Sequence, residues 1–220
     1  MTQFPLSPAI YQLRLVLAGI SPMIWRRLLV SSEITIARLH QYIQASFDWS
    51  GERLHRFRIH GKDYGIPYRG VVGLGDNPRA VPLSRFRLHR RELFRYEYDF
   101  VAHWRVDIRL EEILPHDQRT LPVCVCGRAA ATGEGYAGTL AYLQRLDRHP
   151  YEFPLEELGK IAQAMGRWLD AGSRRALGDL KELREAVERV SEYQEFQPRR
   201  CDRREINRRL RALLDPEVAV

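Results

Sequence analysis

Two neighbouring segments of this chain alternate large apolar side chains with charged ones, and this alternation restricts the fold more than any other feature. In Phe94–Phe100 an aromatic residue occupies every second position, and Trp104–Leu110 repeats the pattern with tryptophan and aliphatic residues. Successive side chains of a strand point to opposite faces of a sheet, so both segments are predicted to be half-buried strands. We expect them to form a hairpin packed by its aromatic residues. Weaker alternation predicts three earlier strands, at 10–17, 25–30 and 54–60.

Helical spacing occurs once among these strands and then dominates the end of the chain. Ser31 and Ser32 can cap a helix whose apolar face includes Leu39 and Ile43, with His40 beside that face. Residues 61–82 are rich in glycine and proline and are predicted to form a surface loop. After a second loop at 114–138, apolar residues at helical spacing predict three helices, within 155–169, 177–190 and 206–213.

Strands that come first and helices that come later indicate an α+β fold, an antiparallel sheet covered by helices, with a helical C-terminal third. With 220 residues, 45% of them hydrophobic, the chain can bury one good core without disulfides or metals as staples. We expect residues 1–150 to form the α+β core. Residues 151–220 are expected to add helices that pack on that core within the same domain.

Cysteine content and hydropathy limit the possible cofactors and location. Cys124, Cys126 and Cys201 are the three cysteines, too few for a disulfide framework or a closed four-ligand zinc site. We therefore expect no metal and no cofactor. No run of about 20 apolar residues occurs, and the N-terminus lacks the layout of a signal peptide. The expectation is a cytoplasmic protein that does not contact the membrane, and the sequence leaves the oligomeric state open.

The net charge of +7 favours polyanionic partners. Of the 35 basic residues 32 are arginine, which suits bidentate contacts to phosphate. Binding of such a surface to nucleic acid releases counterions and therefore gains affinity. A GC-rich coding bias would produce the same excess of arginine without any function.

Several spaced motifs, in order, resemble the plasmid pRiA4b ORF-3-like family, whose members include passenger, TnpR-type proteins of insertion elements. They begin with Tyr11–Leu15 and Ile20–Arg27, continue through the first helix, and reach Tyr96–Phe100 in the aromatic hairpin. Glu205–Leu210 fits the family's final helix. The residues that carry the resemblance are Trp25, Arg26, His40, Trp49, His55, Tyr98, Asp99, Trp104, Tyr142 and Asn207.

The chain departs from the family pattern where an acid and an imidazole are usual. Such proteins usually follow Tyr-Asp-Phe with Gly-Asp and then a tryptophan with a histidine two residues later. Here Ala102 and Val106 occupy the acid and imidazole positions. A second family segment maps onto 131–142 and keeps Glu134, Gly138 and Tyr142. The resemblance therefore implies shape more than chemistry, and no serine-recombinase arrangement is present in the sequence.

Four residues are the candidates for catalysis: His40, His55, Asp99 and Glu134. If they converged, they could bind a divalent metal or act as acid and base in a hydrolase. Each also has a structural interpretation. A histidine beside an apolar helix face is commonly a hydrogen-bonded core residue, and Asp99 could pair with Arg26.

The candidates for nucleic-acid binding are arginines. Arg200, Arg204, Arg208 and Arg211 are spaced by three and four residues and would form one basic stripe on a helix. Further arginines, among them Arg87 and Arg91, precede the aromatic hairpin. The competing interpretation of the stripe is a solvated helix face whose arginine stems cover apolar surface.

Three hypotheses about function follow. The first is a non-catalytic accessory protein of mobile-element or plasmid type that binds DNA or RNA through phosphate contacts. The second is a metal-dependent or acid/base hydrolase whose site has eroded. The third is a protein-interaction module that meets its partner through the aromatic hairpin, which requires an exposed apolar patch of several hundred square ångströms.

Overall fold

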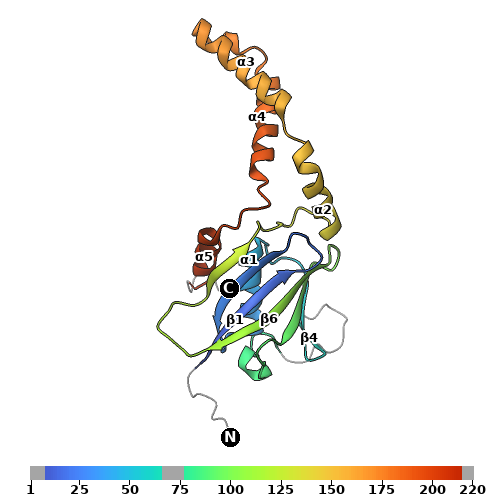
Figure 1. The fold of residues 1–220 in the computed structure, drawn as a ribbon, viewed down its shortest axis with the longest axis vertical. Coiled ribbons are helices and arrows are strands. Elements are labelled where there is room, and N and C mark those ends of the chain that lie inside the picture. The colour runs from blue at the N-terminus through green and yellow to red at the C-terminus, as the bar shows by residue number, and fades with distance from the viewer. Residues whose placement is uncertain (1–7, 66–76, 215–220) are drawn as a thin grey trace. The chain divides into compact units, whose positions relative to one another are not determined.

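The computed structural model describes residues 8–65 and 77–214 and divides the chain into two compact units. Unit 1 comprises residues 1–143 and 199–220, and unit 2 comprises residues 144–198. In the described ranges, unit 1 contains seven strands and two α-helices that belong to it entirely (Figure 1). These elements are β1 Ile10–Leu17, β2 Ile24–Ser31, α1 Ile36–Phe47, β3 His55–Ile59, β4 Lys62–Gly65, β5 Leu93–Tyr98, β6 Trp104–Leu114, β7 Val123–Arg128 and α5 Arg203–Ala212.

All neighbouring strands of the sheet pair antiparallel, in the order β4-β3-β5-β6-β1-β2-β7. The alternation seen in the sequence decides which face each side chain takes. Leu13, Leu15 and Leu17 of β1 are at most 1% exposed, whereas the residues between them lie on the opposite face. The predicted α+β class and the antiparallel sheet are confirmed.

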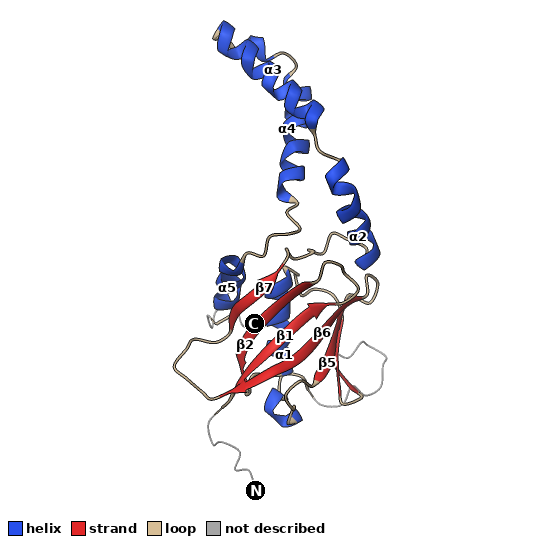
Figure 2. Cartoon of the chain, in the orientation of Figure 1, coloured by secondary structure: helices blue, strands red, loops and turns tan. Residues whose placement is uncertain are grey.

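Helix α1 covers the apolar face of the sheet (Figure 2). It buries Leu39, Ile43 and Phe47, as its spacing predicts. The cap differs from the predicted one, since Thr35 accepts a hydrogen bond from the backbone N–H of Arg38. The hydroxyl of Ser32, predicted to be a cap, instead accepts a hydrogen bond from the backbone N–H of Ala9.

Two strands lie where the sequence predicted loops. Strand β4 follows β3 through a tight turn at His60 and Gly61, whose φ angles of 50° and 76° are those of a hairpin turn. The remainder of the predicted loop at 66–76 lies outside the described residues. Strand β7 pairs with β2 at the other edge of the sheet. Both strands are short and contain few large apolar residues, so periodicity did not reveal them.

Helix α5 protects the exposed edge of β7 through one side chain, that of Asn207. Its Oδ1 accepts from the backbone N–H of Cys124 at 2.7 Å, and its Nδ2 donates to the backbone carbonyl of the same residue at 3.0 Å. The amide thus substitutes for a neighbouring strand at the sheet edge. Ile206 and Leu210, both buried, complete the contact.

Unit 2 is a helical hairpin. Unit 2 begins within helix α2 (Thr139–Arg148). It then contains the short 3₁₀ segment His149–Tyr151, α3 (Leu155–Ala171), the 3₁₀ turn Arg174–Leu177 and α4 (Leu180–Glu195). Helices α3 and α4 pack against each other, but among their residues only Ala164 and Ala186 are fully buried. No described helix in either unit is long and apolar enough to cross a membrane.

Replacing Asn207 by alanine should lower the free energy of unfolding by about 1–3 kcal/mol, because it leaves two edge groups of Cys124 without partners. Urea denaturation followed by circular dichroism measures this change. Arg211→Ala, on the exposed side of the same helix, is the matched control and should change stability by no more than about 0.5 kcal/mol. Equal effects of the two substitutions would contradict this role of Asn207.

Candidate functional site

The two candidate histidines meet between α1 and β3 as a stacked pair. The ring centroids of His40 and His55 are 3.6 Å apart and their planes differ by 11°. Burial lowers the pKa of His40 to about 3, with a further contribution from His55, and lowers the pKa of His55 to about 4. Both imidazoles are therefore neutral at physiological pH and poorly suited to take up a proton.

Tyr96 joins this pair to α1. Its hydroxyl lies 2.8 Å from Nδ1 of His40 and accepts a hydrogen bond from Nε2 of Gln44 at 2.6 Å. Burial raises the pKa of Tyr96 well above its ordinary value. Next to these contacts, Oε1 of Gln44 and Nδ1 of His55 are buried without a hydrogen-bond partner. We call His40, Gln44, His55 and Tyr96 together the polar island. It is a buried cluster within the core rather than an open catalytic cleft.

Glu134 lies beside the island but is fully engaged in hydrogen bonds. Its carboxylate accepts from the backbone N–H of Ser50 at 2.5 Å, from the Ser50 hydroxyl at 2.8 Å and from the Tyr98 hydroxyl at 2.6 Å. Burial favours the protonated form, but these hydrogen bonds outweigh it and lower the pKa of Glu134. Glu134 thus fastens the segment after α1 to β5.

Asp99 does not join the other three candidates. Its Oδ1 accepts from the backbone N–H groups of Val101 and Ala102, and its φ angle is +53°. It therefore closes the turn between β5 and β6. The possible pairing with Arg26 is not formed, because the Arg26 guanidinium donates to the backbone carbonyls of Trp25, Ser46 and Arg128.

The geometry does not favour a shared metal. A metal about 2.0 Å from a nitrogen of one imidazole, in the plane of that ring, would lie far out of the plane of the stacked ring and so could not bind a nitrogen lone pair of that ring. No group of three or more histidine, cysteine or acidic residues in the described ranges could hold a metal ion. Val106, at the family's usual histidine position, pairs with Tyr96 across the sheet and is completely buried.

Most of the residues that carry the family resemblance build the fold. Arg26 is 1% exposed, lies over the Phe47 ring and links β2 to α1 and β7, and burial lowers its pKa. Trp49 stacks on Tyr98 with ring centroids 5.0 Å apart and lies 6.1 Å from the Trp104 ring. Tyr142 is 2% exposed. Such residues specify the core, which explains why motifs can predict shape when they do not predict chemistry.

The predicted basic residues are exposed. Arg204, Arg208 and Arg211 lie on the solvent side of α5, while Arg200 precedes the helix. Arg208 forms an ion pair with Glu205 at 2.6 Å, so the stripe is partly neutralised. Arg87 and Arg91 lie in turns outside the strands, with φ angles of 48° and 71°.

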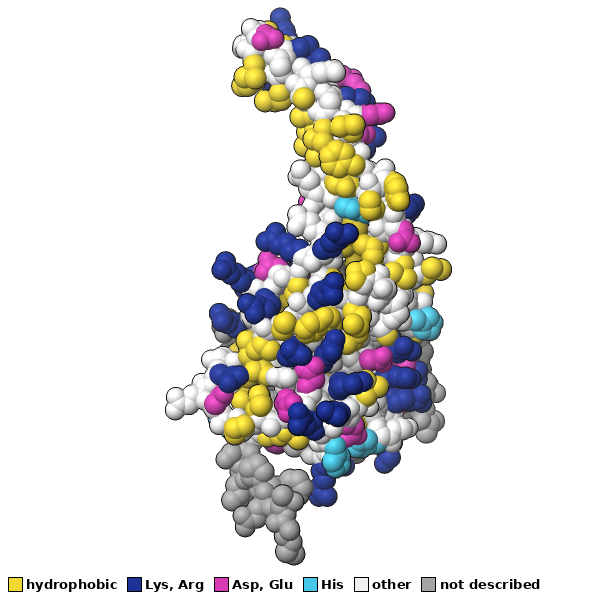
Figure 3. Space-filling view, in the orientation of Figure 1, with side chains coloured by type: hydrophobic (Ala, Val, Ile, Leu, Met, Phe, Trp, Pro, Cys, Tyr) yellow, Lys and Arg dark blue, Asp and Glu magenta, His cyan; other side chains and the backbone are white. Residues whose placement is uncertain are grey.

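The sheet has an open face lined with arginine, which the sequence reasoning did not identify. The register places residues of all seven strands on this face, opposite α1. In the space-filling view, basic side chains gather over the sheet and over α5 (Figure 3). Within the described ranges the open face carries Arg14, Arg27, Arg56, Arg58, Arg95, Arg105, Arg109 and Arg128, against Asp63, Glu97, Asp107, Glu111 and Glu112.

Aromatic rings are interspersed among these cations. The guanidinium carbons of Arg14 and Arg27 lie 4.9 Å and 5.4 Å from the Trp25 ring centroid, and that of Arg56 lies 5.5 Å from the centroid of Phe100. Such pairs combine a positive charge with a flat apolar surface. The alternation of arginine with apolar residues was visible in the sequence, but only the strand register shows that the arginines line up.

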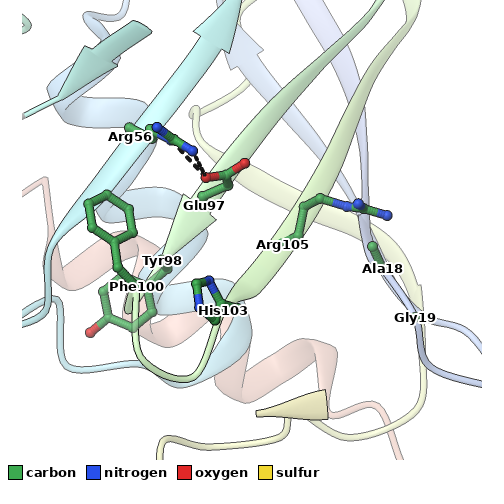
Figure 4. A pocket seen from close by; sticks show the side chains of 8 residues that line it. All are labelled: Ala18, Gly19, Arg56, Glu97, Tyr98, Phe100, His103 and Arg105. Carbon is green, nitrogen blue, oxygen red and sulfur yellow. Dashed lines mark hydrogen bonds and ion pairs between the residues drawn. The ribbon is translucent and has the colours of Figure 1, made fainter. Parts of the chain in front are cut away.

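A pocket of about 430 Å³ opens at one end of the open face, beside the β5–β6 turn (Figure 4). Arg56 and Glu97, joined by an ion pair at 2.7 Å, form one side of it, and Arg105 forms another. The ring of Phe100, 41% exposed, lies over the Arg56 guanidinium. The pocket therefore offers cationic donors, one carboxylate and one apolar ring.

The fold and this site together define an α+β protein with helices on one face of an antiparallel sheet and arginine on the other. The chain belongs to the plasmid pRiA4b ORF-3-like family, whose model matches residues 9–171, and the resemblance found in the sequence is confirmed. Uncharacterized protein y4hQ of Sinorhizobium fredii is 30% identical over 111 residues, which cover 49% of this chain and 56% of that protein. The crystal structure of MM3350 from Methanosarcina mazei Go1, a protein of unknown function, matches with a TM-score of 0.62 and 26% identity, covering 90% of this chain and 96% of that one.

The histidine pair should make the protein sensitive to acid. Between an ordinary histidine pKa of about 6.5 and the folded values of about 3 and 4, the unfolded state binds more protons, so stability falls as pH decreases. Each imidazole contributes a slope of up to about 1.4 kcal/mol per pH unit. Urea denaturation between pH 6.5 and 5 measures this slope above the range in which most carboxyl groups titrate.

The double substitution His40→Gln with His55→Phe should flatten this dependence, because it removes both titrating groups. His116→Gln, at an exposed loop position, is the control and should keep the slope of the original protein. An unchanged slope in the double variant would show that other groups cause the sensitivity to acid.

Proposed function

We propose that this protein is a non-catalytic, cytoplasmic accessory protein that binds nucleic acid through phosphate contacts. It would be of plasmid or mobile-element type, like the TnpR-type passenger proteins of insertion elements. The observation that carries the proposal is the open, arginine-lined face of the sheet. It has eight arginines against five carboxylates, on a surface that α1 and α5 leave uncovered.

The distribution of charge between the units supports this proposal. Residues 144–198 contain nine basic and eleven acidic residues, a net charge of −2, while the whole chain carries +7. Unit 1 therefore carries +9. A general bias toward arginine codons would not by itself separate the charges in this way. A concentrated positive field attracts polyanions and speeds their association.

The geometry of the open face suits an extended phosphate backbone. Arg14 pairs across the sheet with Arg27 on one side and Arg109 on the other, so three guanidinium groups form a row across three strands. Trp25 provides a flat ring next to Arg14 and Arg27, Phe100 provides one next to Arg56, and the pocket beside Phe100 leaves space for an unpaired base. Stacking of bases on aromatic rings together with cationic contacts is how many single-stranded nucleic acids are bound.

A triple substitution, Arg14, Arg105 and Arg109 to glutamine, tests the proposal. Binding to single- and double-stranded DNA and RNA oligonucleotides is measured by fluorescence anisotropy between 50 and 200 mM salt. We expect measurable binding at low salt by the original protein. The triple variant should weaken it at least tenfold and reduce the slope of log K against log salt by about 2–3, because each lost phosphate contact reduces that slope by about 0.7–0.9.

The control removes three cations of unit 2: Arg174, Lys181 and Arg184 are replaced by glutamine. All three are exposed, so the change in net charge is the same but its location differs. In a second variant, Arg204, Arg208 and Arg211 are replaced by glutamine. It measures the contribution of α5 to nucleic-acid binding while keeping the helix itself, because the fold requires α5 at the edge of β7. No binding at low salt, or equal losses in the open-face and control variants, would refute the proposal.

A further inference from the structure

Helices α3 and α4 each carry an apolar stripe that the rest of unit 2 leaves largely exposed, with only Leu158, Leu183 and Val190 partly covered. On α3 the stripe has the three- and four-residue spacing of one helix face, and on α4 it follows a strict heptad. We call the two together the apolar stripe. Its members are Leu155, Leu158, Ala162, Met165 and Leu169 of α3, and Leu180, Leu183, Val187 and Val190 of α4.

Exposure along the apolar stripe is high for residues of this kind. Leu155 and Leu169 are each 70% exposed, and Met165, Leu180 and Val187 are 43–45% exposed. Figure 3 shows hydrophobic side chains gathered in a band over these helices. A two-helix unit whose buried residues are Pro154, Ala164 and Ala186 gains little from its own packing, so the stripe is where additional burial can stabilise it.

The two halves of the apolar stripe lie on the same side of the hairpin. Lys160 contacts Glu182 and Glu157 contacts Arg189, so α3 and α4 run antiparallel. At 3.6 residues per turn, the centre of the stripe on each helix lies between about a third and a half of a turn from these contacts, in the same direction of increasing residue number. In antiparallel helices that rotation leads to one common side. The hairpin is therefore apolar on one face, which is the shape of half a four-helix bundle.

The two faces of the described sheet do not offer a matching cover. In unit 1, α1 and α5 already occupy one face of the sheet, and arginine lines the other. Nucleic acid cannot cover apolar helices, and a unit with a net charge of −2 does not attract it. A nearly neutral, self-complementary apolar face can pack on a copy of itself around a two-fold axis without strong repulsion.

The size of the apolar stripe agrees with such an interface. Its exposed side chains, with the neighbouring Trp168 at 40% exposure, present on the order of 500 Å² of apolar surface. A dimer interface of ordinary size buries about 800 Å² per partner, of which about two thirds is apolar. We propose that unit 2 is a dimerisation element, through which two copies of this chain pair their apolar stripes to form a four-helix bundle.

Light scattering coupled to size-exclusion chromatography tests the proposal on the full chain. At tens of micromolar we expect the mass of a dimer. Met165→Glu combined with Val187→Glu places charge in the centre of the interface and should raise the dissociation constant at least a hundredfold, giving a monomer. Both positions are exposed within a single chain, so the circular dichroism spectrum of the monomeric variant should keep its helical signal.

The matched control, Gln163→Glu combined with Lys181→Glu, adds negative charge to the opposite sides of the same helices and should remain a dimer. Two results would overturn the proposal. One is that the original protein is a monomer at 100 µM. A monomer would also be observed if the apolar stripe packed against another part of its own chain, and that result would equally overturn the proposal. The other is a dimer that persists in the Met165→Glu, Val187→Glu variant, which would place the interface elsewhere.

Discussion

Unit 1 depends on one constraint: each strand residue must face either α1 or the solvent, and the chain alternates accordingly. The inward positions hold aromatic and aliphatic residues that bury almost completely, such as Tyr96, Val106 and Leu15. The outward positions between them hold arginine more often than any other residue, interspersed with carboxylates such as Glu97 and Asp107. Because the period of a strand is two, burying one face automatically displays the other. The hydrophobic core and the basic surface are therefore two consequences of the same pattern.

The elements with strong periodicity could be predicted from the sequence, and the weak ones could not. The aromatic arms Phe94–Phe100 and Trp104–Leu110 and the apolar face of α1 were each evident. Strand β7 contains Gly127 and two cysteines, and its edge is completed by Asn207, 83 residues away from Cys124. No local pattern reveals such a pairing. The open face escaped prediction for a related reason, since the row formed by Arg27, Arg14 and Arg109 exists only once the strand register is known.

The candidate catalytic residues show why proximity in a fold does not amount to chemistry. His40, His55 and Glu134 do come to one region, as the hydrolase hypothesis required, while Asp99 closes a turn. Yet the imidazoles stack face to face and are held neutral by burial, and Glu134 is fully engaged by Ser50 and Tyr98. With Val106 where the family usually has a histidine, Tyr96 packs against an apolar side chain on the neighbouring strand. These residues act here as a polar connection between α1 and the sheet.

The two units separate two kinds of surface that would interfere if they were mixed. Unit 1 exposes positive charge, which favours binding of a polyanion but opposes the approach of a second copy of itself. Unit 2 is nearly neutral and exposes aliphatic side chains, which favour self-association and contribute nothing to phosphate binding. If two copies pair through unit 2, each contributes its own arginine-lined face. On the proposed function, both faces would then engage one nucleic-acid chain, and the second contact would form at the high effective concentration set by the first.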